Sequence, residues 1–304
     1  MRWLALLHGG HTHTTASDGR LSPTGLVERA ARRGVKILGL ADHDTLAGLA
    51  EAQSAGDRLG INIVPGVEIS LKSEPDKGFV GLHLLGYFID PQHPGLVQAI
   101  KKVQQGRLAQ KIAQIKKLQS FGFDIPVKAV LSTVSGVPGR PHIAAVLMKR
   151  HPGRFQTMQQ VFDEYLGSGA RAHVQRPFAL RLKEAVALIQ QAGGIAVLAH
   201  PGVYRNRVDP LTIIRHARAE GLDGIEVHYP YNGHTQPTDN GQSWPDRLKS
   251  LARELQLLQT GGTDFHGRPY EPGEPGDMGL TTAQFSTLQQ GWQRLSQNGH
   301  NRTG

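Results

Sequence analysis

The sequence predicts an α/β fold in which a parallel sheet or barrel is covered by helices and is interrupted by a mainly helical insertion. Short apolar runs alternate with helical patterns over the first ninety residues, and the alternation resumes near residue 195. Strands that form continuous apolar runs are typical of a sheet buried on both faces. Between these two parts, residues 96–178 carry apolar side chains at helical spacing without a strand pattern.

Composition limits the chemistry that this chain can perform. Its 304 residues are 38% hydrophobic and 19% charged, which is typical of a globular protein rather than a disordered one. The chain has no cysteine, so thiolate nucleophiles and Cys-type metal sites are excluded, and any metal must be held by His, Asp or Glu. No apolar run reaches the roughly 18 residues of a membrane span. The apolar stretch in the start MRWLALLHGG is too short for a secretory signal. We therefore expect a cytoplasmic protein with no membrane contact.

The first part of the chain supplies the first half of the barrel. Ser22 and Pro23 predict a helix start, because Ser is a favoured N-cap residue and Pro is favoured at the first helical position. A second helix is expected from about residue 45 to residue 59. The expected strands cover residues 2–7, 35–41, 61–70 and 81–89.

The second part begins after the insertion, which is bounded by Pro94-Gly95 and Arg176-Pro177. Within the insertion, further helices are expected near 141–150 and 157–166. After it, strands are expected at 195–199, 224–229 and 257–267, and helices at 210–220 and 243–256. The sequence thus divides into a barrel domain of residues 1–95 and 179–290, a helical insertion domain of residues 96–178, and a tail of residues 291–304 that we expect to be disordered.

Positive charge is concentrated in the insertion. The formal net charge is +9, and residues 98–183 hold 15 of the 34 Lys and Arg but 3 of the 25 Asp and Glu. The rest of the chain is slightly acidic, and a basic insertion of this kind predicts that the protein binds anionic substrates. The alternative is a solvated basic helix face that binds nothing.

His and carboxylate residues gather where the expected strands end. In a parallel barrel the strand ends open on one face, so residues distant in sequence converge there. An HxH pair on an extended segment places both imidazoles on one side, where both can reach one cation. Nine residues are candidate metal ligands: His11, His13, Asp18, His43, Glu68, His83, His200, Asp264 and His266.

Nine candidate ligands exceed the needs of one ion and predict two or three. Glu68 is the carboxylate best placed to bridge two ions at about 3.5–4 Å, the separation at which a two-metal site activates water for attack on a phosphoester. Hydrolysis is therefore the expected chemistry. The chain has no GxxxxGK[ST], GxGxxG or GxSxG motif, so kinase, dehydrogenase and serine-hydrolase activities have no support.

The motifs that carry these residues resemble those of the PHP (polymerase and histidinol phosphatase) family of metal-dependent phosphoesterases, from about residue 11 to residue 280. They are HTHTTASDG (11–19), LADHDTLAG (40–48), GVEIS (66–70), HLLGY (83–87), GRPHIA (139–144), AHPG (199–202) and GTDFHG (262–267). The resemblance implies a distorted (β/α)7 TIM-like barrel. It also implies a trinuclear centre of divalent ions, most commonly Mn²⁺, with Zn²⁺ or Fe²⁺ as alternatives.

The resemblance also implies which residues share an ion. His11, His13, Glu68 and Asp264 would hold the first, Glu68 would bridge to a second held with His83 and His200, and Asp18, His43 and His266 would hold the third. Among these, Glu68, Asp264 and His266 are the residues expected to take part in catalysis.

The insertion resembles one branch of this family. A helical insertion with GRPH before AHPG is similar to enzymes that remove the 3′-phosphate from 3′,5′-bisphosphonucleotides, such as pAp, and that act as 5′→3′ exoribonucleases on short RNA. Arg140 can donate two hydrogen bonds to a second phosphate, and His142 can donate a third. The alternative is that Arg140 and His142 merely begin a helix. His228, in GIEVHYP, is expected in the substrate pocket.

One departure and two alternative functions accompany the resemblance. The family usually carries Asp two residues before the first His of HxH, and this chain has Gly9 there. Either His8 or another carboxylate compensates, or the metal site is weakened. The alternative functions are another phosphatase of this family, such as one acting on histidinol phosphate, and a catalytically weak nucleic-acid-binding metal protein. No protein partner is inferred.

Overall fold

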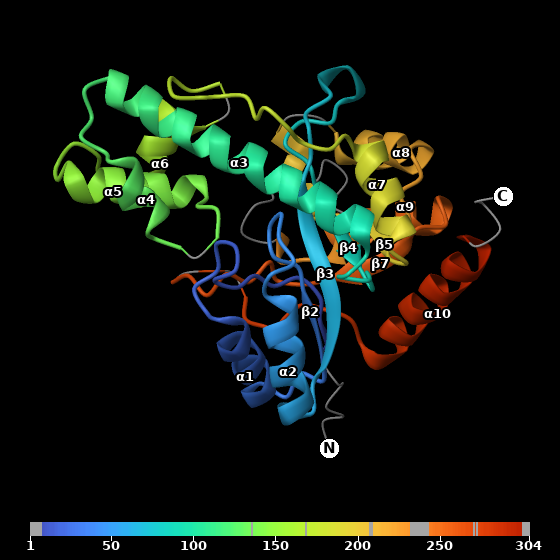
Figure 1. The fold of residues 1–304 in the computed structure, drawn as a ribbon. Coiled ribbons are helices and arrows are strands. Elements are labelled where there is room, and N and C mark those ends of the chain that lie inside the picture. Colours follow the sequence, from blue (N-terminus) through green and yellow to red (C-terminus); the bar gives the residue numbers. More distant parts are fainter. Residues whose placement is uncertain are drawn as a thin grey trace.

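The computed structural model describes residues 8–299, apart from 135, 168, 207–208, 232–242, 270 and 272. These residues form a curled seven-stranded sheet covered by helices, with the strands in chain order from β1 to β7 (Figure 1). The α/β fold and its barrel character are confirmed. The strand expected over residues 2–7 lies outside the described residues.

The strands of the sheet are short and largely buried. They are β1 (His8–Gly9), β2 (Ile37–Leu40), β3 (Asn62–Ser70), β4 (His83–Tyr87), β5 (Ile195–Leu198), β6 (Gly224–His228) and β7 (Leu258–Gly261). The two ends of the sheet meet beyond β1 and β7, where Thr12 forms an isolated parallel bridge with Phe265. The N–H of His13 donates to the carbonyl of Phe265 at 2.8 Å. This contact brings the segment after the first strand beside the segment after the last.

Strand β4 corrects the expectation of an all-parallel barrel. It is antiparallel to both β3 and β5, whereas the other neighbouring pairs are parallel. The connection from β3 to β4 contains only the short 3₁₀ turn Pro75–Lys77, and a parallel pair would need a crossover, usually a helix. The reversal places His83, the first residue of β4, opposite Ser70, the last residue of β3. His83 therefore lies at the same barrel end as the carboxyl ends of the parallel strands.

The helices that connect successive strands cover the barrel: α1 (Pro23–Arg32), α2 (Leu49–Leu59), α7 (Leu182–Gln191), α8 (Pro210–Ala219) and α9 (Trp244–Glu254). Helix α1 begins as predicted, with Ser22 Oγ accepting from the Gly25 N–H at 3.0 Å. Helix α2 begins at Leu49 rather than near residue 45, because the Thr45 hydroxyl accepts from the Ala47 N–H in a local turn.

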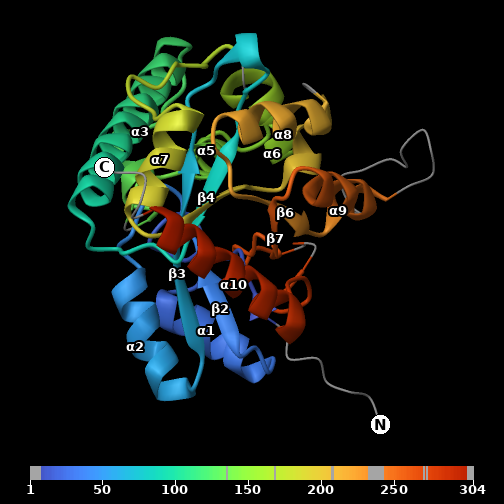
Figure 2. The ribbon, with the colours of Figure 1, turned by 90° about the vertical axis from the view of Figure 1, so that its right-hand side faces the viewer.

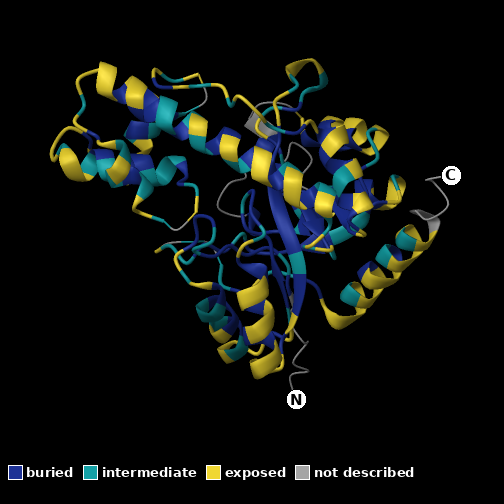
Figure 3. Ribbon diagram, viewed as in Figure 1, coloured by how far each residue is buried: buried dark blue, intermediate teal, exposed yellow. Residues whose placement is uncertain are grey.

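The inserted helices extend to one side of the barrel (Figure 1). They are α3 (Pro94–Ser120), α4 (Val127–Leu131), α5 (Arg140–Arg150) and α6 (Met158–Val161), followed by a π turn over Phe162–Leu166. The first half of α3 packs on the barrel core through Leu96, Ile100 and Val103, and its second half joins a separate apolar cluster with α4–α6. None of the described helices has the length and apolar character of a membrane span. In Figure 3, buried and exposed residues alternate along α3, as in a helix that packs on one of its faces.

The C-terminal segment corrects a second expectation. Helix α10 (Thr282–Gly299) runs through residues 291–299, which we expected to be disordered, and it lies across the outside of the barrel (Figure 2). Trp292 stacks on Phe88 with ring centroids 4.6 Å apart, and its Nε1–H donates to the Gly193 carbonyl at 2.7 Å. Stacking and partial burial of these rings hold the helix against the sheet. Residues 300–304 lie outside the described residues.

Candidate metal centre

The structure brings the nine candidate ligands together at one end of the barrel. Most of their side chains are buried, although His43, His83 and Asp264 are only partly so. Their ligand atoms form three overlapping groups, each within 4.8 Å: His13, Asp18, His43 and His266; His11, His13, Glu68 and Asp264; and His43, Glu68 and His83. His200 adjoins the third group, because its Nε2 lies 3.2 Å from Glu68 Oε1.

Glu68 stands at the centre of the cluster, and its two oxygens face different imidazoles. Oε1 lies 2.9 Å from His83 Nδ1 and faces His200 as well. Oε2 lies between 2.8 and 3.4 Å from ring nitrogens of His43, His13 and His11. A carboxylate whose two oxygens face different sets of imidazoles can bridge two ions.

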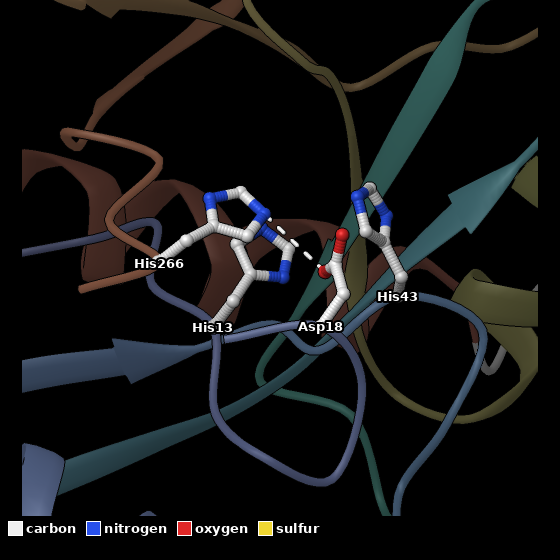
Figure 4. Close-up of side chains that lie close together, drawn as sticks. All are labelled: His13, Asp18, His43 and His266. Atoms are coloured by element: carbon white, nitrogen blue, oxygen red, sulfur yellow. Dashed lines mark ion pairs between the residues drawn. The ribbon is translucent and has the colours of Figure 1, made fainter. Parts of the chain in front are cut away.

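The group around Asp18 forms a second lobe of the cluster (Figure 4). Asp18 Oδ1 lies 3.3 Å from His266 Nε2. The His266 ring stacks on that of His13 with centroids 4.2 Å apart. His43 reaches the same lobe from the segment after β2, so three separate segments of the chain supply one group of ligand atoms.

The polar atoms of the cluster fit metal ions better than they fit one another. Within the described part of the chain, six of its buried atoms have no hydrogen-bond partner of suitable geometry, although opposite charges lie nearby. Four of these atoms face other candidate ligands: Asp18 Oδ1, His43 Nδ1, Glu68 Oε2 and Asp264 Oδ1. Polar atoms that face one another without forming hydrogen bonds are expected of ligands around a cation. The other two are His13 Nδ1 and His200 Nδ1, and both of these rings face Glu68 through Nε2.

The cluster shifts the pKa values of its members in opposite directions. Burial opposes protonation of His13, but hydrogen bonds and charge from Asp264 and Glu68 outweigh it and raise its pKa to about 10. Burial works against ionisation of Glu68, yet the imidazoles of His43 and His83 hold its pKa well below its ordinary value. Without ions, protons on imidazoles therefore balance the carboxylates, and a divalent ion would take their place.

Backbone conformation at the site is unusual. Asp44, His200 and Asp264 adopt positive φ angles of 54°, 31° and 54°. Non-glycine residues avoid this region, at a cost of about 1–3 kcal/mol each, and such residues concentrate at functional sites. All three stand just beyond strand ends, where the chain turns away from the barrel while its side chains remain at the barrel end.

Asp42 fastens the loop that carries the first ligands. Its carboxylate accepts from the Thr14 N–H and hydroxyl, both at 2.7 Å, and from the Ser17 hydroxyl at 2.5 Å. These bonds fix the segment between His13 and Asp18. Asp42 is therefore a positioning residue for both.

Asp44, which follows His43 in the sequence, connects the candidate metal centre to the insertion. It accepts from the Ser70 N–H at 2.8 Å, and its Oδ2 pairs with Arg107 at 2.9 Å and with Arg176 at 3.5 Å. Arg107 lies on α3 and Arg176 lies at the end of the inserted region. Asp44 thus ties both ends of the insertion to the candidate metal centre.

Sequence reasoning missed Glu226 of β6. It is fully buried, contacts His11 Nδ1, and accepts from the His200 N–H at 2.9 Å. The signal was a carboxylate in the middle of the otherwise apolar run GIEVHY, where an unpartnered charge would be costly.

In the described part of the chain, two large cavities adjoin the cluster. The first, here named the basic cavity, has a volume of about 510 Å³ and is lined by Asp18, His43, His83 and His200 on the metal side and by Arg107, Lys111, Arg140 and Arg176 on the insertion side. The second cavity, of about 720 Å³, is lined by Arg20, Thr133, His142 and Arg268 among others. Asp18 and Pro141 line both cavities, so the two adjoin each other.

The three expected substrate-binding residues are placed differently. Arg140 lines the basic cavity, with its guanidinium 5.9 Å from the ring centre of Phe162. His142 lines the second cavity, and its Nδ1 accepts from the Gly139 N–H at 3.0 Å, so it also caps α5. The structure does not bring His228 to either cavity: a β-bulge separates it from Glu226, and the Gln284 amide of α10 lies 3.2 Å from its Nε2.

Comparisons with known proteins agree with this geometry. The family model of the PHP domain matches residues 10–174. A 5′-3′ exoribonuclease of Haemophilus influenzae is 35% identical, over 84% of this chain and 88% of the relative. A 3′,5′-nucleoside bisphosphate phosphatase of Chromobacterium violaceum is 33% identical, over 89% of this chain and 90% of the relative. A crystal structure from Bifidobacterium adolescentis, described as a metal-dependent phosphoesterase, aligns with TM-score 0.79 and 29% identity, over 93% and 95% of the two chains.

Proposed function

The chain belongs to the PHP domain family of metal-dependent phosphoesterases, and on that premise we propose that it removes the 3′-phosphate from 3′,5′-bisphosphonucleotides and degrades short 5′-phosphorylated RNA from the 5′ end. The observation that carries this proposal is the basic cavity, in which candidate metal ligands face four cationic side chains. A substrate with two phosphates offers one to each side. A substrate with one phosphate would leave the cationic side with Asp44 as the counter-charge of both Arg107 and Arg176, and Lys111 without one among the described residues.

We assign the nine clustered residues as ligands of a trinuclear centre, with Mn²⁺ as the leading ion. The resemblance to the PHP family implies Mn²⁺; the carboxylates of the cluster suit Mn²⁺, and its imidazoles suit Zn²⁺ and Fe²⁺. Divalent ions held there supply Lewis acidity toward the phosphoester and its attacking water. Residues 96–178 are then an insertion domain whose role is to bind the rest of the substrate.

The protein's own groups would keep the ligand nitrogens available. His266 Nδ1 lies 2.7 Å from the Asp264 carbonyl, which can only accept, so Nδ1 carries the proton and Nε2 stays free. Glu226 acts in the same way on His11. Glu68, Asp264 and His266 are proposed to act in catalysis through the ions, while Arg140 and His142 contact the substrate.

RNA degradation follows from the same arrangement. In a 5′-phosphorylated RNA chain, the 3′-phosphate of the first nucleotide is also the first internucleotide link. A site that anchors the 5′-phosphate and hydrolyses the 3′-phosphoester would therefore release nucleotides from the 5′ end. The second cavity, with Arg20 and Arg268, adjoins the centre and offers room and charge for the following nucleotide.

The test is hydrolysis by chelator-treated protein reloaded with Mn²⁺, Zn²⁺ or Fe²⁺. We expect turnover of a generic aryl phosphate, and faster turnover of adenosine 3′,5′-bisphosphate than of histidinol phosphate. Glu68→Ala serves as the inactive control. Equal rates on the last two substrates would favour a general phosphatase of this family, and binding of RNA without any hydrolysis would favour a nucleic-acid-binding metal protein.

A further inference from the structure

Three polar residues interrupt the buried face of α3. Its buried positions include Leu96, Ile100 and Val103 at one end and Ile115 and Leu118 at the other. Between them, at the same helical spacing, lie Arg107, Lys111 and Gln114, which are 6%, 5% and 1% exposed. Long charged side chains are almost never buried to this degree without a partner. All three line the basic cavity.

The cations in this row are short of counter-charge. Lys111 Nζ makes only long contacts among the described residues, to the amide oxygens of Gln110 at 3.5 Å and Gln114 at 3.4 Å. Arg107 Nε is buried without a hydrogen-bond partner in the same part of the chain. Asp44 is the carboxylate that pairs with Arg107, and its Oδ2 is shared with Arg176.

The burial of these cations is energetically unfavourable. Burial, and then the charges of Arg107 and Arg140, hold the pKa of Lys111 well below its ordinary value. Arginine beside lysine with one shared carboxylate leaves an excess of positive charge, because none of the described residues that line the insertion side of the cavity is an acid. A dianionic phosphate monoester would supply the missing charge and accept from each of these donors.

We propose that Arg107, Lys111 and Arg176 form the subsite for the second phosphate of the substrate, a proposal that rests on the function proposed above. Asp44 fixes the guanidinium groups of Arg107 and Arg176 next to His43, so the distance from this subsite to the metal centre is set by one residue. Lys111 lines the same cavity, has no ion pair among the described residues, and is the specificity-determining residue. Arg140 borders the subsite, whereas His142 faces the second cavity.

The variant Lys111→Met tests the subsite, because it removes the charge and keeps most of the side-chain volume. Its matched control is Lys116→Met, on the exposed face of the same helix. With Mn²⁺ present, kcat/KM is measured for adenosine 3′,5′-bisphosphate and for adenosine 3′-monophosphate. Lys111→Met should reduce the preference for the bisphosphate by about 10–100-fold, as expected for one charge-assisted phosphate contact, and Lys116→Met should leave the preference intact. An unchanged preference in a folded Lys111→Met protein overturns the proposal.

Binding to chelator-treated protein separates the subsite from the reaction. Calorimetry with adenosine 5′-monophosphate and with adenosine reports recognition of a 5′-phosphate without turnover. The wild type and Lys116→Met should bind the nucleotide about 10–100-fold more tightly than the nucleoside, and Lys111→Met should lose most of that difference. If the wild type hydrolyses no phosphoester but shows this difference, the proposed function fails and the subsite stands. If it hydrolyses the bisphosphate and shows no difference, the subsite alone fails.

Discussion

Glu226 faces the Nδ1 edge of His11 with both carboxylate oxygens, each 3.2 Å away, and both residues are fully buried. The resemblance described above implies an Asp at the position that Gly9 occupies here. Instead, a carboxylate of β6, which lies 215 residues away in the sequence, contacts the first candidate metal ligand. Glu226 also holds the backbone of His200, so it positions two ligands of the cluster.

Replacing Glu226 with Gln should weaken metal binding by about 10–100-fold, because His11 loses the negative charge beside Nδ1 and one of the two acceptor oxygens there becomes an NH2 donor, so its tautomer and orientation are less firmly fixed. Metal affinity is measured by competition with a chelator. The control is Asp223→Asn, another buried carboxylate near β6, which accepts from the Ala196 N–H away from the cluster. Asp223→Asn should lower stability while leaving the metal affinity of folded protein unchanged, and equal losses of affinity in both variants would contradict the assignment.

Glu68→Ala should remove more metal than His83→Ala. Glu68 contacts imidazoles on both of its oxygens, whereas His83 contacts Glu68 through Oε1 alone. We expect the loss of at least two ions per chain from Glu68→Ala and of at most one from His83→Ala, by elemental analysis of the purified proteins. Full metal content and full hydrolysis in Glu68→Ala would rule out a bridging role.

Metal binding should release protons and should strengthen as pH rises. The pKa of His13 is raised to about 10, since Asp264 and Glu68 outweigh the effect of burial, so this imidazole carries a proton at neutral pH when no ion is bound. An ion must displace that proton, and affinity should rise about tenfold per pH unit for each proton released. Mn²⁺ titrations at pH 7 and 8 measure this, and a pH-independent affinity would contradict it.

The raised pKa of His13 also predicts how the stability of the metal-free protein depends on pH. Because the folded pKa of His13 lies above its unfolded value of about 6.5, its contribution is complete below that pH and is lost as pH rises toward about 10. Chelator-treated protein should therefore lose stability between pH 7 and pH 10. Protein loaded with Mn²⁺ should lose less over that range, as measured by urea unfolding. Parallel losses in the two forms would be inconsistent with proton-for-metal exchange.

Lys111→Met should stabilise the substrate-free protein by about 1–2 kcal/mol at pH 7, because it removes a buried and poorly compensated amine. The pKa of Lys111 is lowered by burial, so between the folded and unfolded pKa values the unfolded chain binds a proton that the folded protein does not. Stability of the wild type rises with pH in that window, and the advantage of Lys111→Met should shrink accordingly. Urea unfolding at pH 7 and pH 10 compares the two proteins, and a less stable Lys111→Met would show that its amine is well paired.

Much of the fold and of the candidate site could be read from local patterns. Apolar runs located the strands from β2 onward, and Ser22-Pro23 located the start of α1, because strand periodicity and helix capping depend on residues close in sequence. The identities of the nine candidate ligands followed from His and carboxylate residues at strand ends. Each of these features depends on a few adjacent residues.

The remaining features depend on which segments face one another across the folded chain. The direction of β4 decides that His83 reaches the cluster from the start of its strand, and no pattern within HLLGY specifies that direction. Trp292 stacks on Phe88 within a segment that we expected to be disordered, and this contact joins residues about 200 positions apart in the sequence. The contact of Glu226 with His11 spans 215 residues, and that of Arg107 with Asp44 spans 63. A buried charge is stable only beside its partner, so tertiary packing alone decided which charges complete the centre and which remain for the substrate.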